Sequence, residues 1–147
     1  MPSETGLHDK VARLLAGSSQ RFTPARQTIV DVLAAATGPL PIPAILAASD
    51  GLAQSSVYRN LSVLEEAGVV HRMQTRDDFA YYELAEDLTG HHHHLVCSTC
   101  GRVEDLPATS AVERSVAAAV DQAARKAGFT TQHHRLDLVG TCASCAG

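Results

Sequence analysis

Two Cys-x-x-Cys pairs, Cys97 with Cys100 and Cys142 with Cys145, limit the possible folds of this chain more than any other feature. They contain all four cysteines of the 147 residues. Each pair offers two thiolates about one tight turn apart, and four sulfurs complete tetrahedral Zn²⁺ with no open position for catalysis. Because the pairs lie far apart in the chain, a shared metal would tie the start of the second half to the chain's end. We predict a structural zinc site without which this half does not fold.

Disulfides and a redox dithiol are the alternatives for these cysteines. The sequence has no stretch approaching the roughly 18 uncharged apolar residues of a membrane span, and residues 1–10 lack a signal-peptide pattern. We therefore expect a cytoplasmic protein without a membrane partner, in a compartment where disulfides rarely persist. The redox alternative lacks a thioredoxin-like βαβ context.

The first half of the chain, residues 7–67, predicts a series of short helices. Thr23 is a typical N-cap, Pro24 suits the first helical position, and Gly38 ends the helix that they begin. A short second helix is expected after Pro41, because apolar residues recur there at helical spacing.

A third helix is expected over residues 54–64. Val57, Leu61 and Leu64 share one face, which should be buried, and the opposite face is polar. That polar face suits a helix lying in a DNA major groove. The outward candidates for DNA contact are Ser55, Ser56, Tyr58 and Arg59. A plain helical bundle with a solvated polar face is the alternative.

After the third helix the apolar pattern changes to the period of β-strands. Residues 69–74 and 79–84 predict a hairpin joined by a turn at Arg76-Asp77-Asp78. Three helices followed by a hairpin make a winged helix-turn-helix. The formal net charge of −4 argues against binding through a general basic field, so any contact with nucleic acid must be local.

An acidic link at residues 85–90 separates off the second half. The expected order there is strand, strand, helix and strand, over residues 91–97, 102–106, 109–126 and 133–139. The sequence thus predicts an α+β fold. It has a winged helix-turn-helix at residues 1–84, a hinge at 85–90, and an α/β domain with structural zinc at 91–147.

The run His91-His92-His93-His94 lies just before the first cysteine pair. Because successive side chains of a strand point to opposite faces, His92 and His94 should face one way and His91 and His93 the other. Imidazole with carboxylate favours Zn, Fe, Ni, Co or Mn, and a solvated polar run is the alternative. The candidate partners elsewhere are His71, Glu83, Glu104, Asp105, Glu113, His133 and His134.

Several motifs occur together in a characteristic order. They are Arg21-Phe22-Thr23-Pro24-Ala25-Arg26, Ser56-Val57-Tyr58-Arg59-Asn60-Leu61, Glu65-Glu66-Ala67-Gly68-Val69-Val70, His91 to Gly101, and Gly140 to Cys145. In these motifs, over nearly the whole chain from Leu14 to Cys145, the sequence resembles the ferric uptake regulator family, most of all its zinc-sensing and iron-sensing members.

The resemblance implies a role for each candidate residue. Tyr58 and Arg59 would read the major groove, and Arg21 would reach a neighbouring minor groove. A sensing site between the domains would consist of His71, Glu83, His92 and His94. A further site in the dimerisation domain, residues 91–147, would consist of His91, His93, Glu113 and His134. The four cysteines remain the structural zinc site.

The function implied by the resemblance is metal-dependent repression of metal-homeostasis genes. A homodimer would bind a palindromic operator on double-stranded DNA, with Zn²⁺ or Fe²⁺ as co-repressor and no enzymatic activity. Three alternatives stay open: a peroxide-sensing family member that uses Fe or Mn, a zinc-dependent interaction module without DNA binding, and a metalloenzyme with an activated water.

Three comparisons with the family's pattern give conflicting predictions of the sensed metal. Tyr82-Glu83 stands where many zinc sensors of the family have a cysteine, which resembles iron and peroxide sensors instead. His71, by contrast, stands where zinc sensors have a ligand. The segment Gly38-Pro39-Leu40 lacks the histidine that iron sensors often use there.

Overall fold

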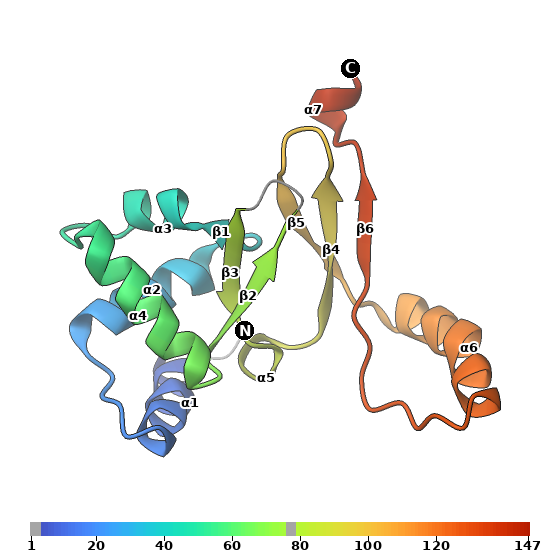
Figure 1. Ribbon diagram of the computed structural model, residues 1–147, viewed down its shortest axis with the longest axis horizontal. Coiled ribbons are helices and arrows are strands. Elements are labelled where there is room, and N and C mark those ends of the chain that lie inside the picture. Colours follow the sequence, from blue (N-terminus) through green and yellow to red (C-terminus); the bar gives the residue numbers. More distant parts are fainter. Residues whose placement is uncertain (1–3, 76–78) are drawn as a thin grey trace.

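The computed structural model describes residues 4–75 and 79–147, so the turn predicted at Arg76-Asp77-Asp78 lies outside the described residues. Figure 1 shows an N-terminal group of helices against one small sheet, and a second sheet beside it with α6 at its far side. The predicted α+β fold, with a winged helix followed by an α/β domain, is confirmed.

Four helices and a three-stranded sheet form the N-terminal domain (Figure 1). The helices are α1 (Glu4–Gly17), α2 (Pro24–Ala35), α3 (Ile42–Ala48) and α4 (Gln54–Glu66). The strands are β1 (Leu40–Pro41), β2 (Val70–Gln74) and β3 (Ala80–Leu84), in the antiparallel order β1-β3-β2. The sequence did not predict β1, because a strand of two residues leaves no alternating pattern.

Local sequence signals fix α2 and α4 as expected. Thr23 caps α2, and its side-chain oxygen accepts a hydrogen bond from the backbone N–H of Arg26 at 3.4 Å. On α4, Val57, Leu61 and Leu64 are at most 1% exposed and belong to the core formed with α1, α2 and α3. Their burial turns the polar face of α4 outward.

The link between the domains contains a short helix, α5 (Glu86–Thr89). Leu88 is only 4% exposed and packs into the N-terminal core. The acidic side chains of the link therefore belong to a helical turn anchored on the first domain.

The C-terminal domain has the sheet order β5-β4-β6, with β4 (His92–Cys97) in the middle. Its other elements are β5 (Val103–Pro107), α6 (Ser110–Lys126), β6 (Asp137–Gly140) and α7 (Ala143–Ala146). The last strand is shorter than predicted, because β6 pairs in parallel with β4 only over Asp137–Gly140. His133 and His134 therefore lie in the irregular segment before β6.

The two domains meet closely along β5. A Cβ atom on Gly38 would lie 3.0 Å from the carbonyl oxygen of Val103, so a side chain there would meet backbone. The hydroxyl of Tyr81 on β3 donates a hydrogen bond of 2.8 Å to the carbonyl of Gly101, between the two domains. Among the described residues, no helix is long and apolar enough to cross a membrane.

Candidate metal centres and DNA-binding face

The four cysteines converge where β4 ends and α7 begins. Their sulfurs all lie within 4.8 Å of one another, and the sulfurs of Cys100 and Cys142 are 3.8 Å apart. A tetrahedron with Zn–S bonds of about 2.3 Å places its sulfurs about 3.8 Å apart, whereas a disulfide bond is about 2.05 Å long. The four thiols thus fit a zinc ion and are free of disulfides.

The charge distribution among these thiols also suits a cation. The backbone N–H groups of Cys100 and Cys142 lower the pKa of Cys97 to about 6. Hydrogen bonds with Cys142 and Cys100 raise the pKa of Cys145 to about 12. The Cys97 thiol therefore ionises readily, whereas ionisation of Cys145 beside it is strongly disfavoured. A divalent cation bound between them would stabilise both thiolates.

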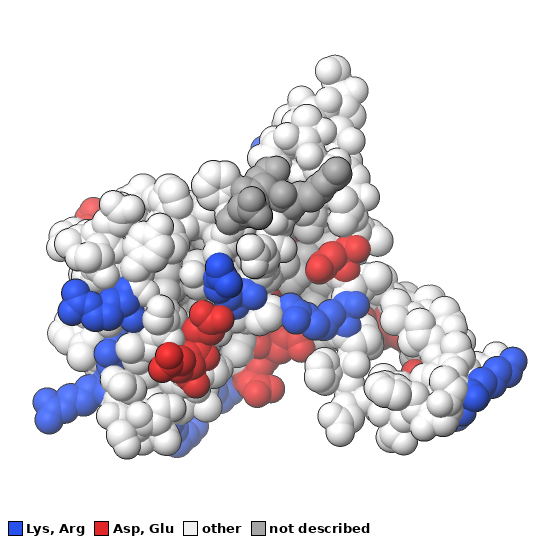
Figure 2. Space-filling view, in the orientation of Figure 1, with Lys and Arg blue, Asp and Glu red and all other residues white. Residues whose placement is uncertain are grey.

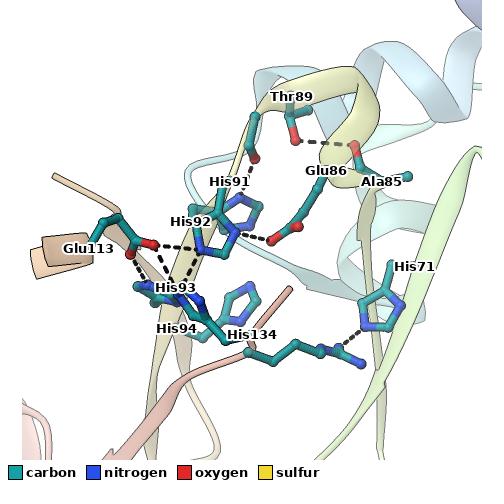
Figure 3. Close-up of polar contacts among 12 residues, drawn as sticks. His71, Ala85, Glu86, Thr89, His91, His92, His93, His94, Glu113 and His134 are labelled. Carbon is teal, nitrogen blue, oxygen red and sulfur yellow. Dashed lines mark hydrogen bonds and ion pairs between the residues drawn. The ribbon is translucent and has the colours of Figure 1, made fainter. Parts of the chain in front are cut away.

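A second cluster joins one face of β4 to α6. His91, His93, Glu113 and His134 place their donor atoms within 4.8 Å of one another. Figure 3 shows the three imidazoles around the Glu113 carboxylate. The Nε2 atoms of His93 and His134 lie 2.6 and 2.9 Å from its two oxygens.

Glu113 reaches this cluster because it lies in the first turn of α6, just after the N-cap Thr109. The hydrogen bond from His93 holds the pKa of Glu113 below its usual value. Three imidazole nitrogens and one carboxylate form a donor set suited to zinc or iron.

A third cluster lies on the opposite face of β4, between the two domains. It consists of Glu83 from β3, His92 and His94 from β4, and Asp105 from β5, again with donor atoms within 4.8 Å of one another. One oxygen of Glu83 lies 2.8 Å from Nε2 of His92 and 3.0 Å from Nε2 of His94. Alternation along β4 thus separates the two pairs of histidines, as the sequence predicted.

Both imidazoles of the third cluster are oriented by their other ring nitrogen. Nδ1 of His92 lies 3.1 Å from the carbonyl of Gly90, and Nδ1 of His94 lies 3.1 Å from the carboxylate of Asp137. In the protonated imidazoles both ring nitrogens donate, Nε2–H to Glu83 and Nδ1–H to these outer oxygens. A metal that replaced the Nε2 proton would leave the Nδ1–H bond in place. Metal-binding histidines are commonly fixed in this way.

Burial and the neighbouring imidazoles act in opposite directions on the carboxylates of the third cluster. Partial burial raises the pKa of Asp105, and the negative charge of Glu83 adds to this effect although His92 and His94 oppose it. Burial also acts to raise the pKa of Glu83, but the hydrogen bonds from His94 and His92 outweigh it and leave that pKa lowered. A divalent cation among these groups would stabilise both ionised carboxylates.

Comparison with known proteins identifies the chain. The family model described as the ferric uptake regulator family matches residues 18–139. The chain belongs to the ferric uptake regulator family. Members of this family are transcription regulators and not enzymes, so the metalloenzyme alternative is dropped.

Individual relatives and structures of the family sense different signals. The peroxide operon regulator of Bacillus subtilis (strain 168) is 30% identical over 132 residues, which are 86% of this chain and 84% of that protein. The structure of the Helicobacter pylori ferric uptake regulator has a TM-score of 0.79 at 20% identity, covering 99% of this chain and 95% of that one. A zinc uptake regulator complexed with zinc and DNA has a TM-score of 0.57 at 23% identity, covering 99% and 97%. The chain is a metal-responsive regulator of this family, whose members include iron, zinc, manganese and peroxide sensors.

Of the residues predicted for sensing in this ferric uptake regulator family member, His71 lines the same pocket as the third cluster but is not among its donors that lie within 4.8 Å of one another. It pairs across the hairpin with Glu83, but its Nε2 contacts the guanidinium of Arg135. Burial and the charge of Arg135 lower the pKa of His71. Asp105 stands in the cluster instead, as one of the partner candidates that the sequence offered without assigning it to this site.

The residues predicted for DNA contact lie at the outer face of the N-terminal domain. Tyr58 is 51% exposed and lines a shallow depression together with Ser55 and Arg59. Ser56 is partly buried and accepts a hydrogen bond from Asn60, while Arg21 is exposed in the segment before α2. Figure 2 shows basic side chains over the helices of this domain.

Proposed function

We propose that this chain is a zinc- or iron-responsive repressor of metal-homeostasis genes that binds a palindromic operator as a homodimer. Residues 1–84 would form the DNA-binding domain, 85–90 the hinge and 91–147 the dimerisation domain. The observation that carries the proposal is the third cluster, because its donors come from both domains: Glu83 from the wing and His92, His94 and Asp105 from the second sheet.

This geometry suggests how metal binding affects DNA binding. A bound divalent cation would add positive charge beside Glu83 and Asp105. Glu83 then holds the wing hairpin against β4 and β5, which fixes the orientation of α4 relative to the second domain. The metal favours this orientation only by its differential affinity for it, on the order of 1–3 kcal/mol in typical allosteric systems.

The exposed apolar surface of the C-terminal domain supports a homodimer. On α6, no residue is buried within the single chain, although Val112, Val116 and Val120 form an apolar stripe. In the sheet, Leu138 and Val139 of the edge strand β6 are 48% and 65% exposed. A second copy would cover these faces, and two recognition helices would then match a two-fold symmetric operator.

Arg59 tests the DNA-binding part of the proposal. We expect Arg59→Ala to cost about 1–3 kcal/mol of binding free energy on a duplex selected from a random-sequence pool, because the exposed guanidinium loses its base contact. Gel-shift titration with buffered free Zn²⁺, Fe²⁺ or Mn²⁺ measures it and also identifies the co-repressor. Wild-type binding that is indifferent to metal would contradict the switch. An absence of any selected duplex would favour the interaction module.

The composition of the sensing site gives a second prediction. Asp105→Asn should weaken metal binding at the third cluster more than His71→Ala does, because Asp105 lies among the donors while His71 contacts Arg135. Isothermal titration of the protein with its structural zinc retained compares the two variants. A larger effect of His71→Ala would restore the sensing set His71, Glu83, His92 and His94.

A peroxide-sensing function is the second candidate. It is favoured by the donor set of the third cluster, two imidazoles and two carboxylates without a thiolate, and by similarity to the Bacillus subtilis peroxide operon regulator. Loss of operator binding by the Fe²⁺-loaded but not the Mn²⁺-loaded protein after hydrogen peroxide treatment would support it.

The similar Helicobacter pylori regulator has three functional metal binding sites, which is consistent with metal at all three clusters described above. We assign the structural zinc to the four cysteines, the sensed metal to the third cluster, and a further divalent metal to His91, His93, Glu113 and His134. We further propose, in line with the sequence, that the protein acts in the cytoplasm.

A further inference from the structure

The segment before α2, residues 20–23, is held in place by the first turns of that helix, and we call it the arm. The carbonyl of Arg21 accepts a hydrogen bond of 2.6 Å from Nη1 of Arg26. The carbonyl of Phe22 accepts one of 3.2 Å from the side chain of Gln27, and the carbonyl of Thr23 accepts one of 2.9 Å from its backbone N–H. The arm therefore has a fixed backbone although it is not part of a helix or strand.

Arg26 also reaches α4, the helix that carries Tyr58 and Arg59. Nε of Arg26 donates a hydrogen bond of 3.0 Å to Oδ1 of Asn60 on α4. The amide nitrogen of Asn60 donates in turn to the backbone carbonyl of Ser56 at 2.9 Å and to its hydroxyl at 3.2 Å. Both ends of the Asn60 amide are thus engaged, and both side chains are partly buried.

We propose that Arg26 and Asn60 form a clamp that sets the position of the arm relative to α4, and so act as positioning residues for DNA binding. The inference rests on the proposed function. Arg21 in the arm would engage one groove of a duplex, and Tyr58 with Arg59 on α4 would engage the neighbouring groove. The guanidinium of Arg26 spans the two elements that carry them.

A clamp would strengthen DNA binding because it reduces the entropy that the arm and α4 lose when both contact a duplex. Two contact points joined rigidly bind a duplex more tightly than the same points on independent segments, because the second contact then forms at high effective concentration. The planar guanidinium suits this task, since its N–H groups point in fixed directions toward two acceptors at once. A lysine at position 26 keeps the charge but has no such fork.

A direct contact between Arg26 and a DNA phosphate is the competing explanation. Such a contact would reduce the slope of log affinity against log salt by about one on removal of the arginine. A clamp changes affinity through Arg21 without changing the number of neutralised phosphates. Asn60 carries no charge, so its removal separates the two explanations.

The experiment uses the full-length, metal-loaded protein and a labelled duplex selected by the wild type from a random-sequence pool. We expect Asn60→Ala to weaken binding by between about 10-fold and 100-fold, the range of a hydrogen bond to a charged group, with an unchanged salt slope. Arg26→Lys should give a similar loss with the same slope. Thr28→Ala is the matched control, because the Thr28 hydroxyl donates to the carbonyl of Pro24 within its own helix. This variant should bind with the wild-type affinity.

A double-mutant cycle supplies the test that a merely structural role cannot pass. In an Arg21→Ala background, Asn60→Ala should cost little more, whereas simple loosening of α4 would reduce affinity equally in both backgrounds. Effects of the two substitutions that multiply, or a salt slope reduced by about one in the uncharged variant Arg26→Gln, would overturn the clamp. If the wild type selects no duplex, the proposed function fails and the clamp with it. If the wild type binds and Asn60→Ala binds equally well, only the clamp fails.

Discussion

Replacing Cys97 with serine is expected to unfold the C-terminal domain while the N-terminal domain stays folded. Within residues 91–147, all of them described, the buried hydrophobic side chains are only Cys97 and Val103. A structural zinc site contributes an apparent binding free energy of about 10–16 kcal/mol, and a whole domain is stable by about 5–15 kcal/mol. A zinc ion bound there would therefore contribute about as much stability as a typical whole domain has.

The N-terminal domain has a core of its own, built from α1, α2, α3, α4 and the hairpin. Limited proteolysis of Cys97→Ser should therefore yield a resistant fragment that ends near the link at residues 85–90. Zinc content and circular dichroism measure the loss directly, and chelation of the wild type should produce the same fragment.

Ser144→Ala is the matched control for the cysteine variant. Ser144 is exposed and lies between Cys142 and Cys145, but it is not one of the four sulfur donors. It should retain one structural zinc and the wild-type unfolding temperature. A zinc-free wild type with an intact C-terminal domain would contradict the structural role.

The cysteines and the alternating histidines show what sequence patterns predict well. A Cys-x-x-Cys turn and the two-residue period of a strand are local rules, so they placed four sulfurs in one cluster and two histidine pairs on opposite faces. The assignment of Glu113 to His91, His93 and His134 followed from the resemblance alone, and the structure brings it to them because α6 begins at Ser110.

The domain junction shows what such patterns miss. His71 and Glu83 face each other across the hairpin, which local rules predict, but Arg135 reaches His71 from the irregular segment before β6. No periodicity determines the path of that segment. Asp105 enters the third cluster through the pairing of β5 with β4, where it lies opposite His94. The pairing of strands from different parts of the chain decides the donor set.

The clamp of Arg26 and Asn60 also depends on the packing of elements from different parts of the chain. Both residues stand in motifs that the sequence analysis singled out, but their partnership depends on the crossing of α2 and α4. Nothing in either motif alone indicates it, since their side chains meet only after the helices have packed.

The wing ligand Glu83 should separate metal binding from its effect on DNA. Among the described donors of the third cluster, it alone comes from the N-terminal domain. Glu83→Gln has nearly the same shape but loses the charge, so His92, His94 and Asp105 still bind the metal more weakly from the second sheet. At saturating metal, DNA affinity should no longer rise with metal, a loss of about 5-fold to 150-fold in the metal-dependent gain.

His92→Ala should behave differently, because it removes a donor that belongs to the second sheet. We expect it to abolish metal binding at this cluster and leave the fold and the structural zinc intact. His133→Ala is the control for both variants: its imidazole lines the same pocket but lies outside the cluster, and both metal affinity and metal-dependent DNA binding should stay at wild-type values. Metal titration and gel shift on the same samples measure the two properties separately.

If Glu83→Gln binds DNA in a metal-dependent way as strongly as the wild type, the link between the domains does not run through the wing. If His92→Ala unfolds the protein, the cluster is structural and the sensed metal binds elsewhere.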